Sequence, residues 1–74
     1  MPIYALKQDL PLELWGKRVT LPRGIKLRKL HGGGDKPDQY AVEDKTLLIR
    51  LTGDAGHALR DYAYVPAEFV AERH

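Results

Sequence analysis

The chain has 74 residues, enough for one small domain (residues 1–74) whose core supplies only about 3–5 kcal/mol of net stability. It carries 12 basic and 10 acidic residues for a net charge of +2, and the absence of cysteine excludes disulfides and thiolate metal sites and favours a reducing compartment. No apolar run is long enough for a signal peptide or a membrane span, so we expect a soluble, cytoplasmic protein with no membrane partner.

Short stretches of alternating apolar and polar residues predict strands, separated by turns that contain Gly or Pro. Without a long helical period, this pattern predicts an all-β fold: a small antiparallel barrel of five or six short strands, with one 3₁₀ turn near the C-terminus. A closed barrel removes its own unpaired strand edges. The expected strands are residues 3–6, 17–21, 25–28, 39–43, 46–52 and 61–65.

The segment after the first strand, Lys7–Glu13, has mixed polarity and is interrupted by proline, so we predict a loop. Leu10, Leu12 and Leu14 alternate, which would let this loop lie across the core as a lid. Trp15, the single tryptophan, follows. It is either a core residue or an exposed anchor for a partner.

Basic residues are concentrated in the first half of the chain. Residues 1–37 hold eight basic and three acidic side chains, a net +5, whereas residues 38–74 hold four basic and seven acidic, a net −3. A local excess of positive charge predicts attraction to phosphates or to an acidic protein surface; the alternative is that the strands simply expose Lys and Arg to water. The cations concerned are Lys17, Arg18, Arg23, Lys26, Arg28, Lys29 and Lys36.

The strand that starts at Ile25 changes phase near its end. Ile25 and Leu27 alternate with cations, but the alternation shifts by one residue at Lys29. Either the strand bends at a bulge there, or Lys29 points inward at the rim of the barrel. The next segment, His31–Asp38, has three consecutive glycines without the pattern of a phosphate-binding loop, and it predicts a mobile hairpin tip.

The run Thr46–Thr52 is β-branched at its ends and apolar in its middle, and it predicts the central strand. By alternation Leu47, Ile49 and Leu51 would face the core, and Leu48 the opposite face. The Gly-containing residues that follow predict a loop with one short helical turn.

The C-terminal segment organises the predicted fold. Residues 61–65 predict a strand in which Tyr62 and Tyr64 share one face, while the residues between and after them share the other. Pro66 cannot donate to a ladder, so the strand ends there or runs along an edge. The next residues are long enough for one 3₁₀ turn that folds Phe69 under the domain.

Two stretches resemble an SH3 domain. Residues 21–30 resemble the part of that family in which a Gly-containing turn starts a strand of alternating apolar residues, and residues 62–70 resemble its closing strand, proline, 3₁₀ turn and buried valine. The resemblance implies an SH3-like barrel, with Pro66 and Phe69 at positions that line the family's groove for proline-rich peptides. We carry over the barrel and not that activity, because the family's paired tryptophans have no counterpart here. Residues 40–43 and the Tyr-x-Pro end are more faintly similar to plasmid-encoded type II dihydrofolate reductases.

Groups for catalysis or metal binding are sparse. His31, His57 and His74 are too scattered for a local metal motif, and the chain has neither Ser nor Cys. Asp54 and His57 could hydrogen-bond within one loop, but no nucleophile lies beside them. We therefore predict no catalytic residue, no metal site and no cofactor.

The sequence thus predicts a non-enzymatic interaction module that docks on a larger protein or nucleoprotein partner and modulates it. The alternative is a nucleic-acid-binding barrel that uses the basic face from Lys17 to Lys36. An oligomeric enzyme of the reductase type and self-association for stability are further hypotheses. The residues predicted to bind the protein partner, chosen because Tyr and Trp anchor interfaces, are Trp15, Tyr62, Tyr64, Pro66 and Phe69.

Overall fold

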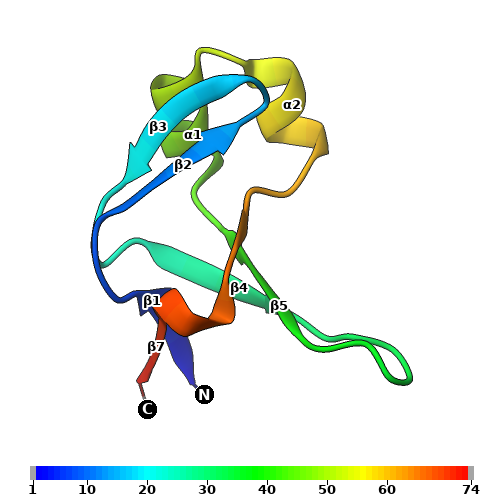
Figure 1. Cartoon of the computed structure of the whole chain (residues 1–74). Helices are drawn as coiled ribbons and strands as arrows, with labels where there is room; N and C mark the ends of the chain where they lie inside the picture. The colour runs from blue at the N-terminus through cyan, green and yellow to red at the C-terminus, as the bar shows by residue number, and fades with distance from the viewer. Residues whose placement is uncertain (1, 74) are drawn as a thin grey trace.

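The computed structural model describes residues 2–73, in which strands are the most common secondary structure. Five strands form one curled antiparallel sheet in the order β6-β5-β4-β1-β7: β1 (Ile3–Leu6), β4 (Lys26–Leu30), β5 (Gln39–Val42), β6 (Tyr64–Val65) and β7 (Val70–Arg73). The remaining elements are β2 (Leu10–Leu14), β3 (Lys17–Leu21), α1 (Lys45–Thr52), α2 (Ala55–Arg60) and the 3₁₀ turn η1 (Ala67–Phe69). Figure 1 shows the β2–β3 hairpin and the two α-helices together at one end of the molecule, with the sheet at the other.

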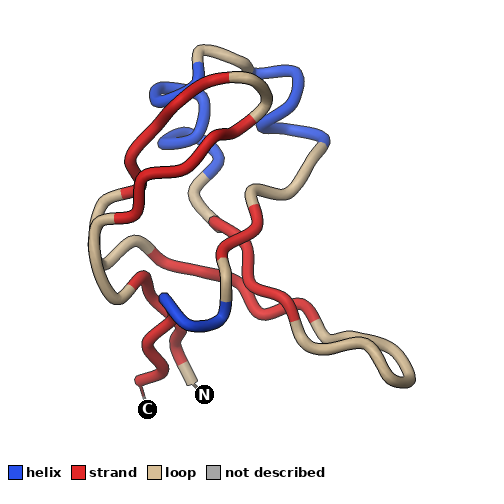
Figure 2. The backbone as a smooth tube through the Cα atoms, viewed as in Figure 1, coloured by secondary structure: helices blue, strands red, loops and turns tan. Residues whose placement is uncertain are grey.

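The antiparallel sheet confirms part of the predicted fold, and the two α-helices contradict the all-β part. The tube in Figure 2 shows how strands and helices are separated along the chain. Within residues 2–73, no helix combines the length and apolar character needed to cross a membrane.

The run Thr46–Thr52 lies in helix α1, so the predicted central strand is wrong. Asp44 is the N-cap, and its carboxylate accepts a hydrogen bond from the Leu47 N–H (3.0 Å). Gly53 ends the helix in the left-handed conformation (φ 67°), and its N–H donates to the Ile49 C=O (2.7 Å). The helix is therefore closed at both ends by residues that flank the predicted strand.

The helix buries a different set of side chains than a strand would. Leu48 and Thr52, one turn apart, are fully buried, whereas Leu47, Ile49 and Leu51 are only partly buried. Leu48, expected on the face away from the core, is thus a core residue. The Thr52 hydroxyl donates to the Leu48 C=O (2.7 Å) and accepts from the N–H of the α2 N-cap (3.1 Å), so this buried polar group is satisfied and ties α1 to α2.

Helix α2 occupies the segment predicted to be a loop. Its N-cap is Asp54, whose carboxylate accepts from the His57 N–H (3.0 Å). Ala58 is the residue of this helix that is buried. The short helical turn expected near this point is real, but it belongs to a complete helix of six residues.

The loop predicted over Lys7–Glu13 is also wrong, because strand β2 covers most of it. β2 pairs with β3, and the pair Leu14↔Lys17 closes around a two-residue turn. Trp15 and Gly16 form that turn with positive φ angles (50° and 83°), which suit the twist of a tight hairpin. Gly adopts such angles freely, whereas Trp does so at a cost in backbone strain.

The hairpin places its alternate leucines as the lid prediction required. Leu10 and Leu14 are buried, and Leu12 packs against the core. Pro11 has no N–H to donate. In the alternating pattern of the β2–β3 ladder, the backbone nitrogen of this residue points away from β3, so no hydrogen bond is lost.

One core joins the sheet, the hairpin and the helices. Its buried members come from every part of the chain between β1 and β6, so residues 2–73 share a single hydrophobic centre rather than two. They are Leu6, Leu10, Leu14, Val19, Leu21, Leu27, Val42, Leu48, Ala58, Ala63 and Val65.

The phase change in β4 reflects an inward lysine rather than a bulge. β4 pairs continuously with β5, from Leu27↔Val42 to Lys29↔Tyr40. Lys29 therefore shares the inner face of the sheet with Leu27, and its side chain is 27% exposed.

The C-terminal segment follows its prediction in part, because only Tyr64 and Val65 of the predicted strand 61–65 form β6. β6 ends at Val65, directly before Pro66, and η1 closes as the Phe69 N–H donates to the Pro66 C=O (3.0 Å). Phe69 packs against the core. The chain then forms β7, an edge strand that sequence analysis missed, and β7 pairs with β1 from Ile3↔Arg73 to Leu6↔Val70.

Candidate interaction surface

The tyrosine strip, defined as Tyr62, Tyr64 and Pro66, lies along the outer side of the segment that connects α2 to η1. Tyr62 and Tyr64 are 44% and 47% exposed, and their ring centroids lie 5.8 Å apart with an interplanar angle of 49°. The intervening Ala63 and the following Val65 are buried. Strict alternation therefore holds the two rings on the surface by burying their neighbours.

A lysine from α1 stands over the strip. The Lys45 ammonium lies 5.3 Å from the centroid of the Tyr62 ring, and it also donates a hydrogen bond to the Asp61 C=O (3.1 Å). The hydrogen bond and the ring face hold the cation in place at the end of the strip.

A shallow groove runs beside Tyr64. It has a volume of about 430 Å³ and opens where β5 and β6 diverge beyond the pair Tyr40↔Val65. Most of its exposed lining is apolar, with an amide and a carboxylate at one side. Its lining residues are Pro37, Asp38, Gln39, Tyr64, Val65, Pro66 and Ala67.

Arg28 shares the outer face of the sheet with Tyr64. Ala41 pairs with Arg28 on one side and with Tyr64 on the other, so the three residues form one row across β4, β5 and β6. Arg28 and Tyr64 are exposed, whereas the small Ala41 between them is 1% exposed. The Arg28 guanidinium and the Tyr64 ring thus lie on either side of a buried alanine.

The structure does not gather all five predicted docking residues. Trp15 lies at the hairpin turn, where its ring stacks on His57 (centroids 5.6 Å apart, interplanar angle 15°), and Phe69 packs against the core. The His57 Nδ1 lies 2.6 Å from an Asp54 carboxylate oxygen. The pKa of Asp54 is lowered, first by the His57 N–H and then by the His57 ring.

The predicted basic residues occupy different parts of the molecule. Lys26 and Arg28 alternate on the outer face, whereas Lys29 lies on the inner face. Lys26 pairs with Glu43 (3.6 Å), and Lys17 lies at the hairpin end, where its charge helps to lower the pKa of Asp54. Of the rest, Arg23 lies in the turn after β3 and Lys36 in the loop between β4 and β5.

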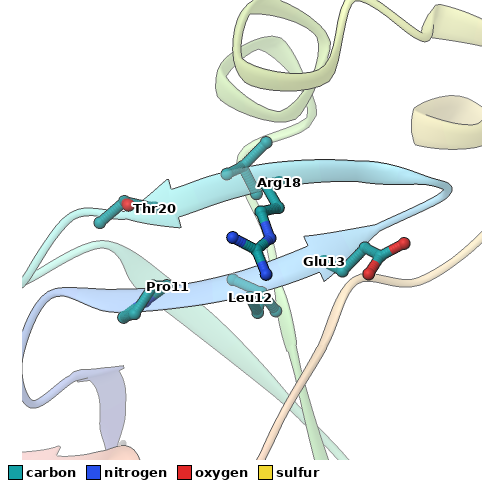
Figure 3. Close-up of a pocket in the computed structure, with 6 residues that line it drawn as sticks. Pro11, Leu12, Glu13, Arg18 and Thr20 are labelled. Atoms are coloured by element: carbon teal, nitrogen blue, oxygen red, sulfur yellow. The ribbon is translucent and has the colours of Figure 1, made fainter.

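Arg18 lies over a separate concavity on the outer side of the hairpin. Figure 3 shows its guanidinium between the two strands, while the Glu13 carboxylate points away from it. The concavity has a volume of about 550 Å³. Its lining residues are Pro11, Leu12, Glu13, Arg18, Val19 and Thr20.

The inner rim of the sheet carries a second aromatic group. The Tyr4 and Tyr40 ring centroids lie 5.4 Å apart, and the Lys29 ammonium lies 5.6 Å from the Tyr4 centroid and 3.4 Å from an Asp38 carboxylate oxygen. A hydrogen bond with Glu72 raises the pKa of Tyr4, and the bond to Asp38 raises the pKa of Lys29. The aromatic and charged groups at this rim are therefore partnered within the chain.

Asp38 connects the inner rim to the loop of residues 31–38, which contains three glycines and is called the glycine loop below. Its carboxylate accepts from the Gly32 N–H (3.1 Å), which is the largest cause of its lowered pKa, and it lies 3.8 Å from the His31 ring nitrogen. Among the residues that the structure describes, no group of three or more His, Asp or Glu side chains could hold a metal ion. His74, the third predicted histidine, lies outside the described residues.

Lys45 and the groove beside Tyr64 were missed by sequence analysis. Lys45 lies between two of the predicted strands, and the signal that could have found it is the Asp44 N-cap, which starts a helix beside the closing strand. The groove is lined by Pro37 and Pro66, which lie beyond the ends of β5 and β6, and only the pairing of these strands brings both prolines to one groove.

The chain was compared with protein-family models, with curated proteins and with solved structures, and none of the three comparisons gives a match. Its function is therefore inferred from the geometry described above.

Proposed function

We propose that this protein is a non-enzymatic interaction module that docks on a larger protein or nucleoprotein partner through the tyrosine strip and modulates that partner. The observation that carries the proposal is the exposure of two neighbouring tyrosine rings, Tyr62 and Tyr64, at 44% and 47%. Tyr supplies a large, rigid contact area with a polar tip, and it is enriched at interfaces and among residues that dominate binding energy.

The surroundings of the strip support docking rather than a reaction. The groove beside Tyr64 is shallow and mostly apolar, which suits a protein side chain better than a small substrate. Lys45 adds a fixed cation at one end, and Arg28 adds another across the row from Tyr64. Charges beside an aromatic surface orient a partner and raise its rate of association.

Affinity purification of the tagged full chain from its native host, followed by quantitative mass spectrometry, tests the proposal. We expect the double variant Tyr62→Ala/Tyr64→Ala to retain at least about tenfold less of the specific partners than the wild type, because these two residues are the expected hot spots. Circular dichroism should show the same fold, since both rings are exposed.

Ile3→Ala is the matched control. Ile3 is another large exposed apolar side chain, at 52%, but it lies in β1 and not on the strip. Partner recovery should be unchanged in this variant. Equal recovery of the same proteins by the wild type and by the double tyrosine variant would show that the strip is not the docking surface.

Single-stranded nucleic acid is a second candidate partner. The supporting observation is the row Arg28–Ala41–Tyr64, which joins a cation to an exposed ring on one face, as in proteins that combine phosphate contacts with base stacking. A fluorescence titration with oligo(dT) at two salt concentrations is the test. Binding should be strongest at low salt, so an absence of binding there removes this candidate.

We also infer that the fold is a variant of the SH3-like barrel and that the protein works in the cytoplasm. The order of closing strand, proline, 3₁₀ turn and final strand supports the first inference. The lack of cysteine supports the second.

A further inference from the structure

One edge of the sheet offers unpaired peptide groups beside the tyrosine strip. β6 stands at one end of the strand order, so on its other side it has no partner strand within residues 2–73. The Val42 N–H donates to the Ala63 C=O (3.0 Å), and peptide groups alternate in direction along a strand, so those of Ala63 and Val65 point toward β5. The N–H and C=O groups of Tyr64 therefore point toward the free edge, and those of Tyr62 would do so where pairing extends β6 by two residues.

We propose that a second copy of this chain pairs with this edge, which joins two sheets into an antiparallel dimer. The segment is self-complementary about Ala63. When Ala63 lies opposite Ala63 of the second copy, Tyr62 of each copy lies opposite Tyr64 of the other. Both tyrosine pairs then exchange two N–H···O=C hydrogen bonds, and cross-strand aromatic pairs add to the attraction. This proposal goes beyond the docking function and does not rest on it.

Charge complementarity selects a second copy as the occupant. Antiparallel pairing about Ala63 brings the end of α2 in each copy alongside η1 in the other. Arg60 ends α2 and Glu68 lies in η1, and both are exposed. The Arg60 Nε donates to the Gly56 C=O (3.2 Å), which leaves the rest of the guanidinium available. Two Arg60–Glu68 pairs would therefore flank the joined strands, one at each end.

The other edge strands carry the residues that normally block such pairing. β7 has Glu72 and Arg73, β2 has Pro11, and β3 has Lys17 and Arg18. β6 and the two residues before it hold only Tyr, Ala and Val. Among the edges of the described part of the chain, β6 is thus the one without a charge or a proline inside the pairing segment.

Dimerisation would enlarge the docking surface without covering it. Side chains in a sheet project away from the plane that contains the hydrogen bonds, so edge pairing leaves Tyr62 and Tyr64 on the outer face. The rings of both copies then form one continuous surface of four tyrosines. A short pairing segment gives a weak dimer, with a dissociation constant in the micromolar to millimolar range.

Sedimentation velocity and amide hydrogen exchange of the full chain, each at low and high concentration, test the proposal. We expect a dimer to appear at high concentration, with the Tyr62 and Tyr64 amides exchanging about tenfold more slowly than in dilute protein. The Glu72 amide, which by the alternation of the β1–β7 ladder points toward the opposite edge of the sheet, should not change. A chain that stays monomeric at millimolar concentration, or a dimer that protects the Glu72 amide instead, overturns the proposal.

A charge exchange provides a second test with exposed residues that should not disturb folding. Arg60→Glu and Glu68→Arg should each weaken the dimer by about fivefold or more, because each places two like charges together. The double variant restores opposite charges and should recover most of the wild-type affinity. If the double variant remains as weak as the single variants, the two residues do not face each other and the proposed register is wrong.

Discussion

Two tyrosine pairs of similar geometry lie on opposite faces of the same sheet. The inner pair, Tyr4 and Tyr40, has ring centroids 5.4 Å apart and an interplanar angle of 57°; the outer pair, Tyr62 and Tyr64, has 5.8 Å and 49°. The inner rings are half-buried at the rim, and the outer rings are exposed. Ring geometry alone therefore does not distinguish a structural pair from a binding surface.

The neighbours of the two pairs make that distinction. A lysine ammonium lies over one ring of each pair, Lys29 over the inner and Lys45 over the outer, at 5.6 and 5.3 Å. Lys29 also bonds to Asp38, and Glu72 bonds to Tyr4, so the inner pair is connected to two further strands or loops. Over the outer pair, Lys45 bonds instead to the Asp61 C=O, within the same segment as the two rings. The inner pair therefore contributes to the fold, while the outer pair remains available to a partner.

The largest expected difference between the pairs is in stability. Tyr4→Ala removes a ring that packs against the core and also contacts Tyr40 and Glu72, so we expect the melting temperature to fall by about 10 °C or more. Tyr64→Ala removes an exposed ring and should change it by less than about 3 °C. Thermal unfolding followed by circular dichroism measures both. If Tyr64→Ala is as destabilising as Tyr4→Ala, Tyr64 belongs to the core and the tyrosine strip is not a docking surface.

The two lysines provide a smaller and more closely matched contrast. Lys29→Met keeps the aliphatic stem but removes the cation between Tyr4 and Asp38, and we expect it to lower the melting temperature by about 5 °C. Lys45→Met makes the same chemical change over the outer pair, where the ring is exposed, and should lower it by no more than about 2 °C. Equal losses in the two variants would mean that the inner lysine has no structural role beyond that of the outer one.

The sequence predicted the outer tyrosine pair but not the inner one. Strict alternation around Ala63 predicted that Tyr62 and Tyr64 share one face, and the structure places both on the surface. The inner pair could not be predicted, because it depends on β1 and β5 both lying beside β4, and strand order is not a local property of the sequence. Lys29 gave a partial signal, since its shift in phase left an inward position as one of two alternatives.

Two of the wrongly predicted elements, α1 and β2, depend on residues at or near their ends. In α1, the apolar run Leu47–Leu51 fits either a strand or a helix, and the evidence that decides it lies in the caps, Asp44 and Gly53. In β2, the alternation of leucines was present, but Pro11 and an unusual Trp15 turn concealed the hairpin. Local pattern therefore fixed the position of most strands, whereas short apolar runs required their end signals to be read as well.

The smallest expected effect is the dependence of stability on pH at the inner rim. The Gly32 N–H and Lys29 lower the pKa of Asp38 in the folded chain below its ordinary value. The unfolded chain therefore binds a proton at Asp38 at a higher pH than the folded chain does. This contribution to stability is fully present above about pH 4 and is lost as the pH falls through the folded pKa.

Asp38→Asn tests this dependence, because asparagine keeps the shape of the side chain and does not titrate. Between neutral pH and about pH 3, the urea midpoint of the variant should fall less steeply than that of the wild type. Some decline should remain, because the pKa of Asp54 is also lowered at the hairpin end of the molecule. Identical acid profiles for the two proteins would mean that Asp38 does not stabilise the contact between the glycine loop and the inner rim. One of the contacts that distinguish the inner tyrosine pair from the outer pair would then have no structural role.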